Sequence, residues 1–401
     1  MDAMQLLDKE SDKPPSISTD RRSRWLVAVI ANVKEENHST FNEPADAGAE
    51  FDKLETVQSI QGAIEADGHQ TIFLPADVNL PYALRDVHPD ICFNIAEGYG
   101  ADAREAQVPA LLAMMGIPYT ASCVLANAIS LDKTLTKRIW RDVRLPIAPF
   151  QEFITGKEPL RGYLDFPLFV KPDREGTGMG VDQGAKVNNI EELRERVTWV
   201  IETYHQPALV ESFLPGREFT VGVMGREDAL LSSHKPELYA IDGFHRFPVL
   251  EIESYRSITP GIYSNAAKSK ALDESGAPGY FCPANLEPGL AEKLQKLALR
   301  AHQAIGALDV SRVDIRLDED GNPRLLEINT LPGLNPEVSD ICIMAKAEGL
   351  PYCDLILEIL YLAAGRYGLL APQLVMQPLR SVRQSKILNR IPLNSLPQIA
   401  S

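Results

Sequence analysis

Short apolar runs alternate with amphipathic segments in the first part of the chain. Residues 25–31 (WLVAVIA) are continuously apolar, which is typical of a strand buried on both faces in a parallel sheet. Apolar residues then recur at helical spacing over 51–64, and residues 71–74 form a second apolar run. A strand, a helix and a strand in this order predict a right-handed βαβ unit, and residues 88–94 predict a third strand.

The alternation resumes after the proline-rich segment 146–149, which we interpret as a linker between domains. A mixed basic and apolar helix is predicted before the linker, over 131–143. After it, the pattern predicts strands over 167–171 and 207–211, with a helix over 190–204 between them. The sequence therefore predicts an α/β chain with more than one domain.

A third region begins with a predicted strand over 218–224 and ends with a predicted helix over 353–362. Within it, the alternating segments 313–317 and 325–329 flank the turn residues 320–323 (DGNP). We expect these two segments to form a β-hairpin.

This hairpin would place Asp314, Glu327 and Asn329 close together, with the last two on the same face of their strand. Two carboxylates and an amide oxygen form a hard-oxygen site of the kind that binds Mg²⁺ together with ATP phosphates. The alternative is an ordinary polar strand face in contact with solvent.

Two further segments carry candidate chemistry. Residues 171–180 (KPDREGTGMG) contain small residues that allow backbone N–H groups to approach phosphate oxygens, although a glycine-rich hairpin turn has the same composition. The segment is neither a Walker A loop nor a dinucleotide-binding G-x-G-x-x-G motif. Residues 211–218 (ESFLPGRE) place two glutamates around a Pro-Gly turn, which suits an adenine slot and a ribose but also an ordinary turn between strands.

The composition narrows the classes of protein. Among 401 residues, 55 are acidic and 40 are basic, and the formal charge of −15 opposes nonspecific binding to nucleic acid or anionic lipid. No apolar run approaches the ~18 residues that cross a bilayer, which excludes a membrane protein. Residues 1–24 lack the apolar core of a signal peptide, so we expect a cytoplasmic protein.

Taken in order, these features and residues 116–120 (GIPYT) resemble the D-alanine–D-alanine ligases of the ATP-grasp superfamily over residues 25–365. The motifs that carry the resemblance are Asp132-Lys133, Lys171-Pro-Asp-Arg-Glu-Gly176, Glu211 with Pro215-Gly-Arg-Glu218, Phe281-Cys-Pro-Ala284, Arg312-Val-Asp314 and Leu326-Glu-Ile-Asn-Thr-Leu-Pro-Gly333.

The resemblance implies a three-domain ATP-grasp architecture of the α/β (α+β) class, with a Rossmann-like parallel sheet in the N-terminal domain and ATP between the other two domains. It also implies a homodimer formed through the N-terminal domain. The expected division is a disordered tail over 1–23, an N-terminal pre-ATP-grasp domain over 24–126, a central ATP-grasp lid domain over 127–213, a C-terminal ATP-grasp catalytic domain over 214–366 and a basic tail over 367–401.

The family implies ATP and Mg²⁺ as cofactors, with Mn²⁺ as an alternative metal. By position, Asp314, Glu327 and Asn329 match the magnesium ligands of the family. The residues implied to contact ATP are Lys133, Lys171, Thr177, Gly178, Glu211, Phe213, Leu214 and Glu218.

The implied reaction has two steps. A carboxylate attacks the γ-phosphate of ATP to give an acyl phosphate, and an amine then attacks the acyl carbon through a tetrahedral intermediate. Lys268 matches the lysine of the loop that closes over the γ-phosphate. Arg312 and the backbone N–H of Gly333 match the pair that stabilises the oxyanion.

The substrate pocket departs from the family at four positions. The His-Gly of the family is Glu97-Gly98 here, which introduces an anion suited to binding an amine. The tyrosine that follows the loop lysine is replaced by Ser269, and the Ser-Leu pair that holds the second substrate's carboxylate falls on Val338 and Ser339. These changes indicate a different pair of substrates.

The segment 226–262 is longer than is usual in the family. It brings His234, His245 and Arg246 toward the expected entry of an acceptor, or it forms a surface hairpin with no role in the reaction.

We therefore predict an ATP-dependent carboxylate–amine ligase that forms an amide bond between small amino-acid-like substrates other than two D-alanines. A carrier-protein or peptide acceptor is compatible with the same mechanism. One alternative is a true D-alanine–D-alanine ligase of peptidoglycan synthesis. An alternative of another class is a noncatalytic, nucleotide-binding regulatory protein.

Overall fold

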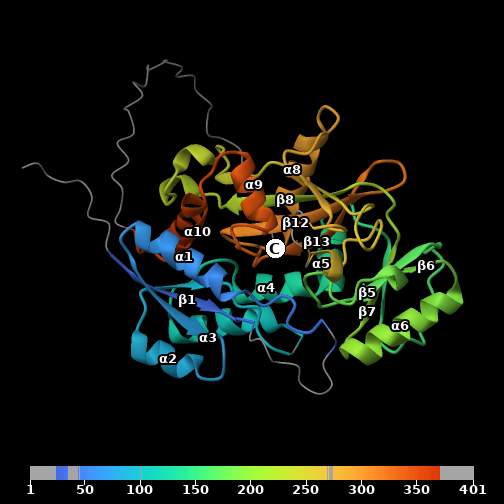
Figure 1. Cartoon of the computed structure of the whole chain (residues 1–401), viewed down its shortest axis with the longest axis horizontal. Helices are drawn as coiled ribbons and strands as arrows, with labels where there is room; N and C mark the ends of the chain where they lie inside the picture. The colour runs from blue at the N-terminus through green and yellow to red at the C-terminus, as the bar shows by residue number, and fades with distance from the viewer. Residues whose placement is uncertain are drawn as a thin grey trace, which may run out of the picture. The chain divides into compact units, whose positions relative to one another are not determined.

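The computed structural model describes residues 24–34, 44, 46–100, 102–268, 270 and 274–370, which form three β-sheets and their covering helices (Figure 1). The expected N-terminal tail and residues 371–401 of the expected basic tail lie outside the described residues. No helix in the described part has the length and apolar character needed to cross a bilayer.

The N-terminal sheet is parallel, with strand order β2-β1-β3, and it confirms the predicted βαβ unit. β1 is buried over almost its whole length because it lies in the middle of this sheet, which explains its continuous apolar run. The elements are β1 (Leu26–Ala31), α1 (Leu54–Ala66), β2 (Gln70–Pro75), α2 (Leu80–Val87), β3 (Ile91–Asn94) and α3 (Gln107–Met115).

The second sheet is antiparallel, with strand order β4-β7-β5-β6. Helix α6 buries Leu193, Val197 and Val200 in the core that it shares with this sheet. Two helices, α4 and α5, precede the sheet, and Asp132 caps α5 by accepting a hydrogen bond from the Leu135 N–H at 2.7 Å. The elements are α4 (Val124–Leu131), α5 (Lys133–Asp142), β4 (Phe150–Phe153), β5 (Leu168–Pro172), β6 (Lys186–Val187), α6 (Ile190–Tyr204) and β7 (Ala208–Ser212).

The third sheet has strand order β11-β10-β8-β12-β13, with β9 also paired to β8. β12 and β13 form the antiparallel hairpin predicted from the sequence. The elements are β8 (Glu218–Gly225), β9 (Phe244–Arg246), β10 (Leu250–Glu253), α7 (Asn265–Lys268), β11 (Gly279–Phe281), α8 (Leu290–Ala304), β12 (Val310–Leu317), β13 (Pro323–Asn329), α9 (Asp340–Ala347) and α10 (Tyr352–Arg366).

The last helix packs on the first one, so the two ends of the described chain share a hydrophobic core (Figure 1). Ile356 and Leu360 of α10 belong to the same buried cluster as Val57 and Ile60 of α1. Arg366, at the end of α10, forms an ion pair of 2.7 Å with the buried Asp309. The C-terminal region is therefore fixed directly against the N-terminal sheet and its helices.

The long segment 226–262 packs on α9 and α10. His245 Nε2 lies 2.8 Å from a carboxylate oxygen of Glu348, and the ring of His234 stacks on Tyr361 at 5.5 Å. Arg246 pairs with Asp242 within the segment itself. These contacts hold both histidines against the C-terminal helices, and neither lines the pocket described below.

Candidate active site

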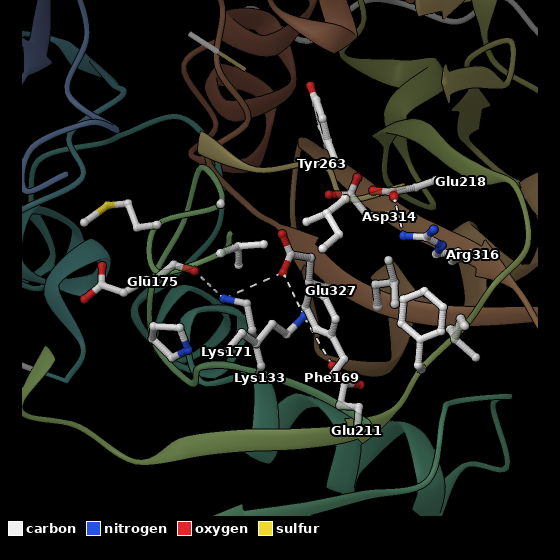
Figure 2. A pocket seen from close by; sticks show the side chains of 18 of the residues that line it. Lys133, Phe169, Lys171, Glu175, Glu211, Glu218, Tyr263, Asp314, Arg316 and Glu327 are labelled. Atoms are coloured by element: carbon white, nitrogen blue, oxygen red, sulfur yellow. Dashed lines mark hydrogen bonds and ion pairs between the residues drawn. The ribbon is translucent and has the colours of Figure 1, made fainter. Parts of the chain in front are cut away.

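A pocket with a volume of about 830 Å³, counted out to its mouth, is lined by residues of β5 and β7 and by residues of β8, β12 and β13 (Figure 2). This size is typical of small-molecule sites. Every residue that the sequence implied for ATP contact lines the pocket except Thr177, the neighbour of the lining residue Gly178. Lys268, Asp314 and Glu327 line it as well, whereas Arg312 and Asn329 do not.

A row of alternating charges crosses this pocket. Lys137 Nζ lies 2.7 Å from Glu211 Oε1, and Lys171 Nζ lies 3.3 Å from Glu211 Oε2. Glu327 Oε2 lies 3.6 Å from Lys171 Nζ and 3.8 Å from Lys133 Nζ, so both ammonium groups point at one carboxylate (Figure 2). We call these five residues the charge row. Of the three lysines, Lys133 and Lys171 line the pocket and present ammonium groups suited to phosphate binding, whereas Lys137 is fully buried and does not line it.

Burial and pairing act in opposite directions on the protonation of the charge row. Burial favours a raised pKa for Glu211 and Glu327, but the neighbouring lysines outweigh it and lower both values. Burial lowers the pKa of Lys137 despite Glu211, whereas the two glutamates raise the pKa of Lys171 against the effect of burial. Both carboxylates are thus held ionised at neutral pH.

Aromatic rings and an ion pair lie at the other end of the pocket. The rings of Phe169 and Phe213 are tilted at 33° with centroids 6.4 Å apart, and Lys186 Nζ lies 4.4 Å from the Phe213 ring centroid. Glu218 is paired with Arg316 at 3.2 Å (Figure 2). Flat apolar walls beside a carboxylate suit a planar base attached to a hydroxylated sugar.

The glycine-rich loop, residues 173–180, touches the helix that carries Lys268. Thr177 and Gly178 adopt left-handed backbone conformations, with φ values of 52° and 69°. Asn265, at the start of α7, donates its backbone N–H to the Gly178 carbonyl at 3.2 Å and its side-chain amide to the Thr177 carbonyl at 3.1 Å. The two segments expected to cover the phosphates are therefore joined to each other.

A segment of the N-terminal region reaches the same loop. Asp46 Oδ2 accepts a hydrogen bond from the Gly180 N–H at 2.8 Å. Glu50 accepts one from Arg104 Nε at 2.8 Å, and Arg104 also donates to a carboxylate oxygen of Glu175 at 3.1 Å. Asp46 thus contacts the glycine-rich loop directly, and Glu50 holds the Arg104 side chain that contacts it.

The β12–β13 hairpin places Asp314 directly opposite Glu327, and Arg312 opposite Asn329. Among the described residues, no group of three or more His, Cys, Asp or Glu side chains is placed to hold a metal ion. The Nδ2 atom of Asn329 is buried and has no hydrogen-bond partner in the described part of the chain, which is expected where a ligand supplies the partner. Two carboxylates and an amide fit Mg²⁺ if phosphate oxygens complete its coordination.

Arg312 is held by two carboxylates. Its Nε and Nη2 atoms each donate to Asp314 at 3.0 Å, and its Nη1 atom lies 3.2 Å from Asp340 Oδ2. The backbone of Gly333 is exposed, and a Cβ atom there would lie 2.9 Å from Ser339 Oγ. The arginine is thus fixed in orientation, and a side chain at position 333 would require Ser339 to move.

Glu97 lies in a group of acidic side chains that we call the acid cluster, formed by Glu50, Asp52, Glu97 and Glu105. Burial raises the pKa of Glu97 well above its usual value, and the charges of the other three members raise it further. Burial also raises the pKa of Glu105 to about 7, although Arg104 opposes the shift. The raised pKa values favour neutral carboxyl groups in the cluster, and a cationic ligand bound among them would favour their ionised forms.

Of the remaining predicted substrate residues, Val338 and Ser339 do not line the pocket. Val338 is 51% exposed. Ser339 Oγ accepts a hydrogen bond from the Asn335 N–H at 2.9 Å, within its own loop. Ser269 lies outside the described residues.

Sequence reasoning missed four charged residues that the structure brings to these sites: Lys137, Asp340, Glu50 and Glu105. Lys137 had a detectable signal, because it lies four residues after Lys133 and therefore on the same face of a predicted helix. Asp340 follows the predicted Ser339 directly, but its contact with Arg312 becomes visible only in the fold.

Comparison with known proteins agrees with this geometry. Residues 139–361 match the family model described as D-ala D-ala ligase C-terminus. The uncharacterized protein y4sG of Sinorhizobium fredii is 33% identical over 317 residues, which cover 77% of this chain and 87% of that protein. The D-alanine–D-alanine ligase of Bartonella henselae is 33% identical over 299 residues, covering 73% and 87% of the two chains.

A solved structure shows the same fold. The D-alanine–D-alanine ligase of Bacillus anthracis in complex with ATP superimposes with a TM-score of 0.63 at 20% sequence identity, covering 86% of this chain and 99% of that one. Its likeness confirms the expected three-domain ATP-grasp architecture. The chain belongs to the D-alanine–D-alanine ligase family of ATP-grasp enzymes and is an ATP-dependent carbon–nitrogen ligase.

Proposed function

We propose that this chain joins an amino-acid-like carboxylate to an amine through an acyl phosphate, and that its substrates are not two D-alanines. The observation that carries the proposal is that the lysines of the charge row contact Glu327, which belongs to the β12–β13 hairpin that also carries Asp314 and Arg312. Lysines suited to phosphates lie within 4 Å of Glu327, which is opposite Asp314, and Asp314 in turn holds Arg312.

In this proposal, Lys133 and Lys171 bind oxygens of the transferring phosphate. Mg²⁺, held by Asp314, Glu327 and Asn329, would neutralise phosphate charge when bound. The guanidinium of Arg312 donates to the acyl oxygen as negative charge develops there, a contribution that is typically worth ~3–4 kcal/mol in the transition state. Closure of the glycine-rich loop on α7 would exclude the water that hydrolyses an acyl phosphate.

The acid cluster supports a donor that carries an ammonium group beside its carboxylate. Arg104 donates to Glu50 of the cluster at 2.8 Å and to Glu175 at 3.1 Å, and the Glu175 carbonyl accepts a hydrogen bond from Lys133 Nζ, so the cluster lies next to the phosphate end of the charge row. An α-amino acid bound there would direct its ammonium to Glu97 and its carboxylate toward the phosphates. This arrangement gives Glu97, which stands where the family has a histidine, a role in donor binding.

Trapping the acyl phosphate with hydroxylamine tests the proposal without knowledge of the acceptor. The enzyme would be incubated with ATP, Mg²⁺, hydroxylamine and single D- or L-amino acids, and hydroxamate and ADP would be measured. We expect both products with at least one amino acid, and their loss in Lys171→Met. Lys157→Met, which removes an exposed lysine of the same domain, is the matched control. Absence of hydroxamate with every carboxylate would contradict the proposal.

A true D-alanine–D-alanine ligase is the second candidate, because relatives at 33% identity, including that of Nitrosococcus oceani, carry this name. D-alanine would then serve as both donor and acceptor. Mass spectrometry of the product formed from D-alanine, ATP and Mg²⁺ alone distinguishes the two candidates, since formation of the dipeptide at a useful rate would favour the second.

We also propose a homodimer formed through the N-terminal domain. Three apolar side chains are exposed around α2 and α3: Val78 (87%), Tyr82 (66%) and Met114 (87%). Light scattering of the wild type and of Met114→Glu at micromolar concentration tests this proposal, and a monomeric wild type would contradict it.

A further inference from the structure

A buried aspartate shares the arginine that the proposed reaction uses. Asp340 Oδ2 lies 3.2 Å from Arg312 Nη1, and the two side chains are 8% and 15% exposed. Asp340 begins α9, directly after the exposed loop residue Val338 and Ser339. Burial raises the pKa of Asp340 and the Arg312 guanidinium opposes this shift, so the negative charge at the edge of the site is stabilised by the ion pair.

The geometry of Arg312 places this charge on the side of the acceptor. A guanidinium has five N–H donors. Asp314 accepts from Nε and Nη2, whereas Nη1 and Asp340 form an ion pair of 3.2 Å, so three N–H groups remain to donate to an acyl oxygen. An oxygen bound there lies ~3 Å from the guanidinium. An amine that attacks the attached carbon therefore arrives within a few ångströms of Asp340.

Besides Arg312, two charged groups act electrostatically on Asp340: the carboxylate of Asp314 and the ammonium of Lys268, which lines the pocket. The hydroxyl groups of Tyr263 and Tyr280 are 2.8 Å apart, and Asp340 and Arg312 both act electrostatically on Tyr263. Figure 2 shows the Tyr263 hydroxyl at the end of the ring remote from Lys171, so it faces away from the phosphate end of the pocket. Lys268 lies 4.3 Å from the centroid of the Tyr263 ring, which faces the nucleotide pocket.

A carboxylate on the acceptor would have to approach an arginine whose charge two aspartates already balance. Like charges at this separation in a buried site disfavour binding. A neutral amide or a second ammonium group in the same position would meet hydroxyl groups and a carboxylate instead.

We infer that Asp340 determines acceptor specificity, and that the acceptor is an amine whose neighbouring carbon carries a neutral or cationic group rather than a carboxylate. The inference rests on the proposed ligase function and adds the chemical class of its second substrate. Asp340 makes no contact with the reacting atoms in this account; it selects the acceptor by charge.

Three acceptors with the same carbon skeleton test the inference: alanine, alaninamide and 1,2-diaminopropane, each supplied as both enantiomers. The donor would be the amino acid that gives hydroxamate most rapidly, and products would be identified by mass spectrometry. We expect kcat/KM for alaninamide or the diamine to exceed that for alanine by about ten-fold or more. Asp340→Asn should reduce this ratio by about ten-fold, mainly through KM for the acceptor.

Glu337→Gln is the matched control, because it removes an exposed carboxylate from the same loop. It should leave the ratio unchanged. If Asp340→Asn does not fold, Asp340→Ser provides a second variant with the same charge change.

Two results would overturn the inference. One is a wild-type preference for alanine that Asp340→Asn leaves unaltered. The other is loss of hydroxamate formation in both Asp340 variants, which would show that Asp340 acts by positioning Arg312 and not on the acceptor. Absence of hydroxamate in the wild type would instead contradict the proposed function itself, so the two failures are distinguishable.

Discussion

Replacement of Lys137 by methionine tests the charge row most directly. Lys137 is completely buried, and its ammonium contacts Glu211 at 2.7 Å and the Leu325 carbonyl at 3.2 Å. Methionine has a similar length and no charge, so it leaves Glu211 Oε1 without its lysine in a buried position. Removal of one member of a buried ion pair typically costs about 3–5 kcal/mol of the free energy of unfolding. That loss is a large fraction of the ~5–15 kcal/mol that stabilises a folded domain.

The partner variant Glu211→Gln makes the prediction specific to the pair. It leaves the Lys137 ammonium with only the Leu325 carbonyl in the described contacts, so its expected cost is also about 3–5 kcal/mol. The double variant removes both charges, while Lys171 keeps its pairing with Glu327 at 3.6 Å. We expect the double variant to lie within about 2 kcal/mol of the wild type, which corresponds to a strong favourable coupling.

Urea unfolding followed by fluorescence is the assay, because the fully buried Trp140 lies on the same helix as Lys137. Lys157→Met serves as the control for removal of an exposed lysine. Losses below about 1 kcal/mol in both single variants, or losses that add in the double variant, would refute the reasoning.

Three further predictions concern other parts of the molecule. Burial raises the pKa of Glu358 from 4.5 to about 7. The protonated form therefore contributes stability that is full below pH 4.5 and is lost as the pH rises through 7. Glu358→Gln should remove this dependence of the unfolding temperature, as measured by thermal unfolding at pH 5 and pH 8. Arg312→Ala should lower kcat for amide formation by about 10²–10³, and an unchanged rate of ADP release with both substrates would exclude the oxyanion role. Gly178→Ala should raise KM for ATP, because φ is 69° and a Cβ atom would lie 2.8 Å from Asn265 N, whereas Gly62→Ala in the exposed face of α1 should leave KM unchanged and stabilise the helix by about 0.5–1 kcal/mol.

The parts of the fold that the sequence predicted are those with an unbroken apolar or alternating pattern. β1 and the β12–β13 hairpin are examples, since their periodicity follows directly from burial on two faces or on one. Helix α4 was not predicted because its buried face is partly polar. Asn127 Oδ1 accepts a hydrogen bond from the Thr330 hydroxyl at 2.7 Å, and Ser130 contacts the same hydroxyl at 2.7 Å. Such a polar face removes the hydrophobic periodicity that marks a helix.

Most residues that line the pocket were predictable as a group because they lie on short continuous segments. Lys171 precedes its glycine-rich loop, and Glu211 and Glu218 flank one turn. Each motif can therefore be recognised from a few neighbouring residues in the sequence. The acid cluster has no such local signature, because Arg104 and Glu50 are 54 positions apart and meet only after the N-terminal domain has folded.

The distribution of charge explains how one site would bind the anionic phosphates of a nucleotide and the ammonium groups of amine substrates at different places. The charge row carries more lysines than glutamates, whereas the acid cluster and the Arg312 pair with Asp314 and Asp340 carry more carboxylates than guanidinium groups. Phosphates are therefore favoured at Lys133 and Lys171, and ammonium groups are favoured at the acid cluster and beside Asp340. An acyl phosphate has its anionic end in the first region and its acyl carbon beside Arg312, where a cationic or neutral amine is the acceptor that the local charge admits. Glu97 and Asp340 extend this separation to both proposed substrates, which is the physical basis for proposing that the chain keeps the ATP chemistry of its family and differs in what it joins.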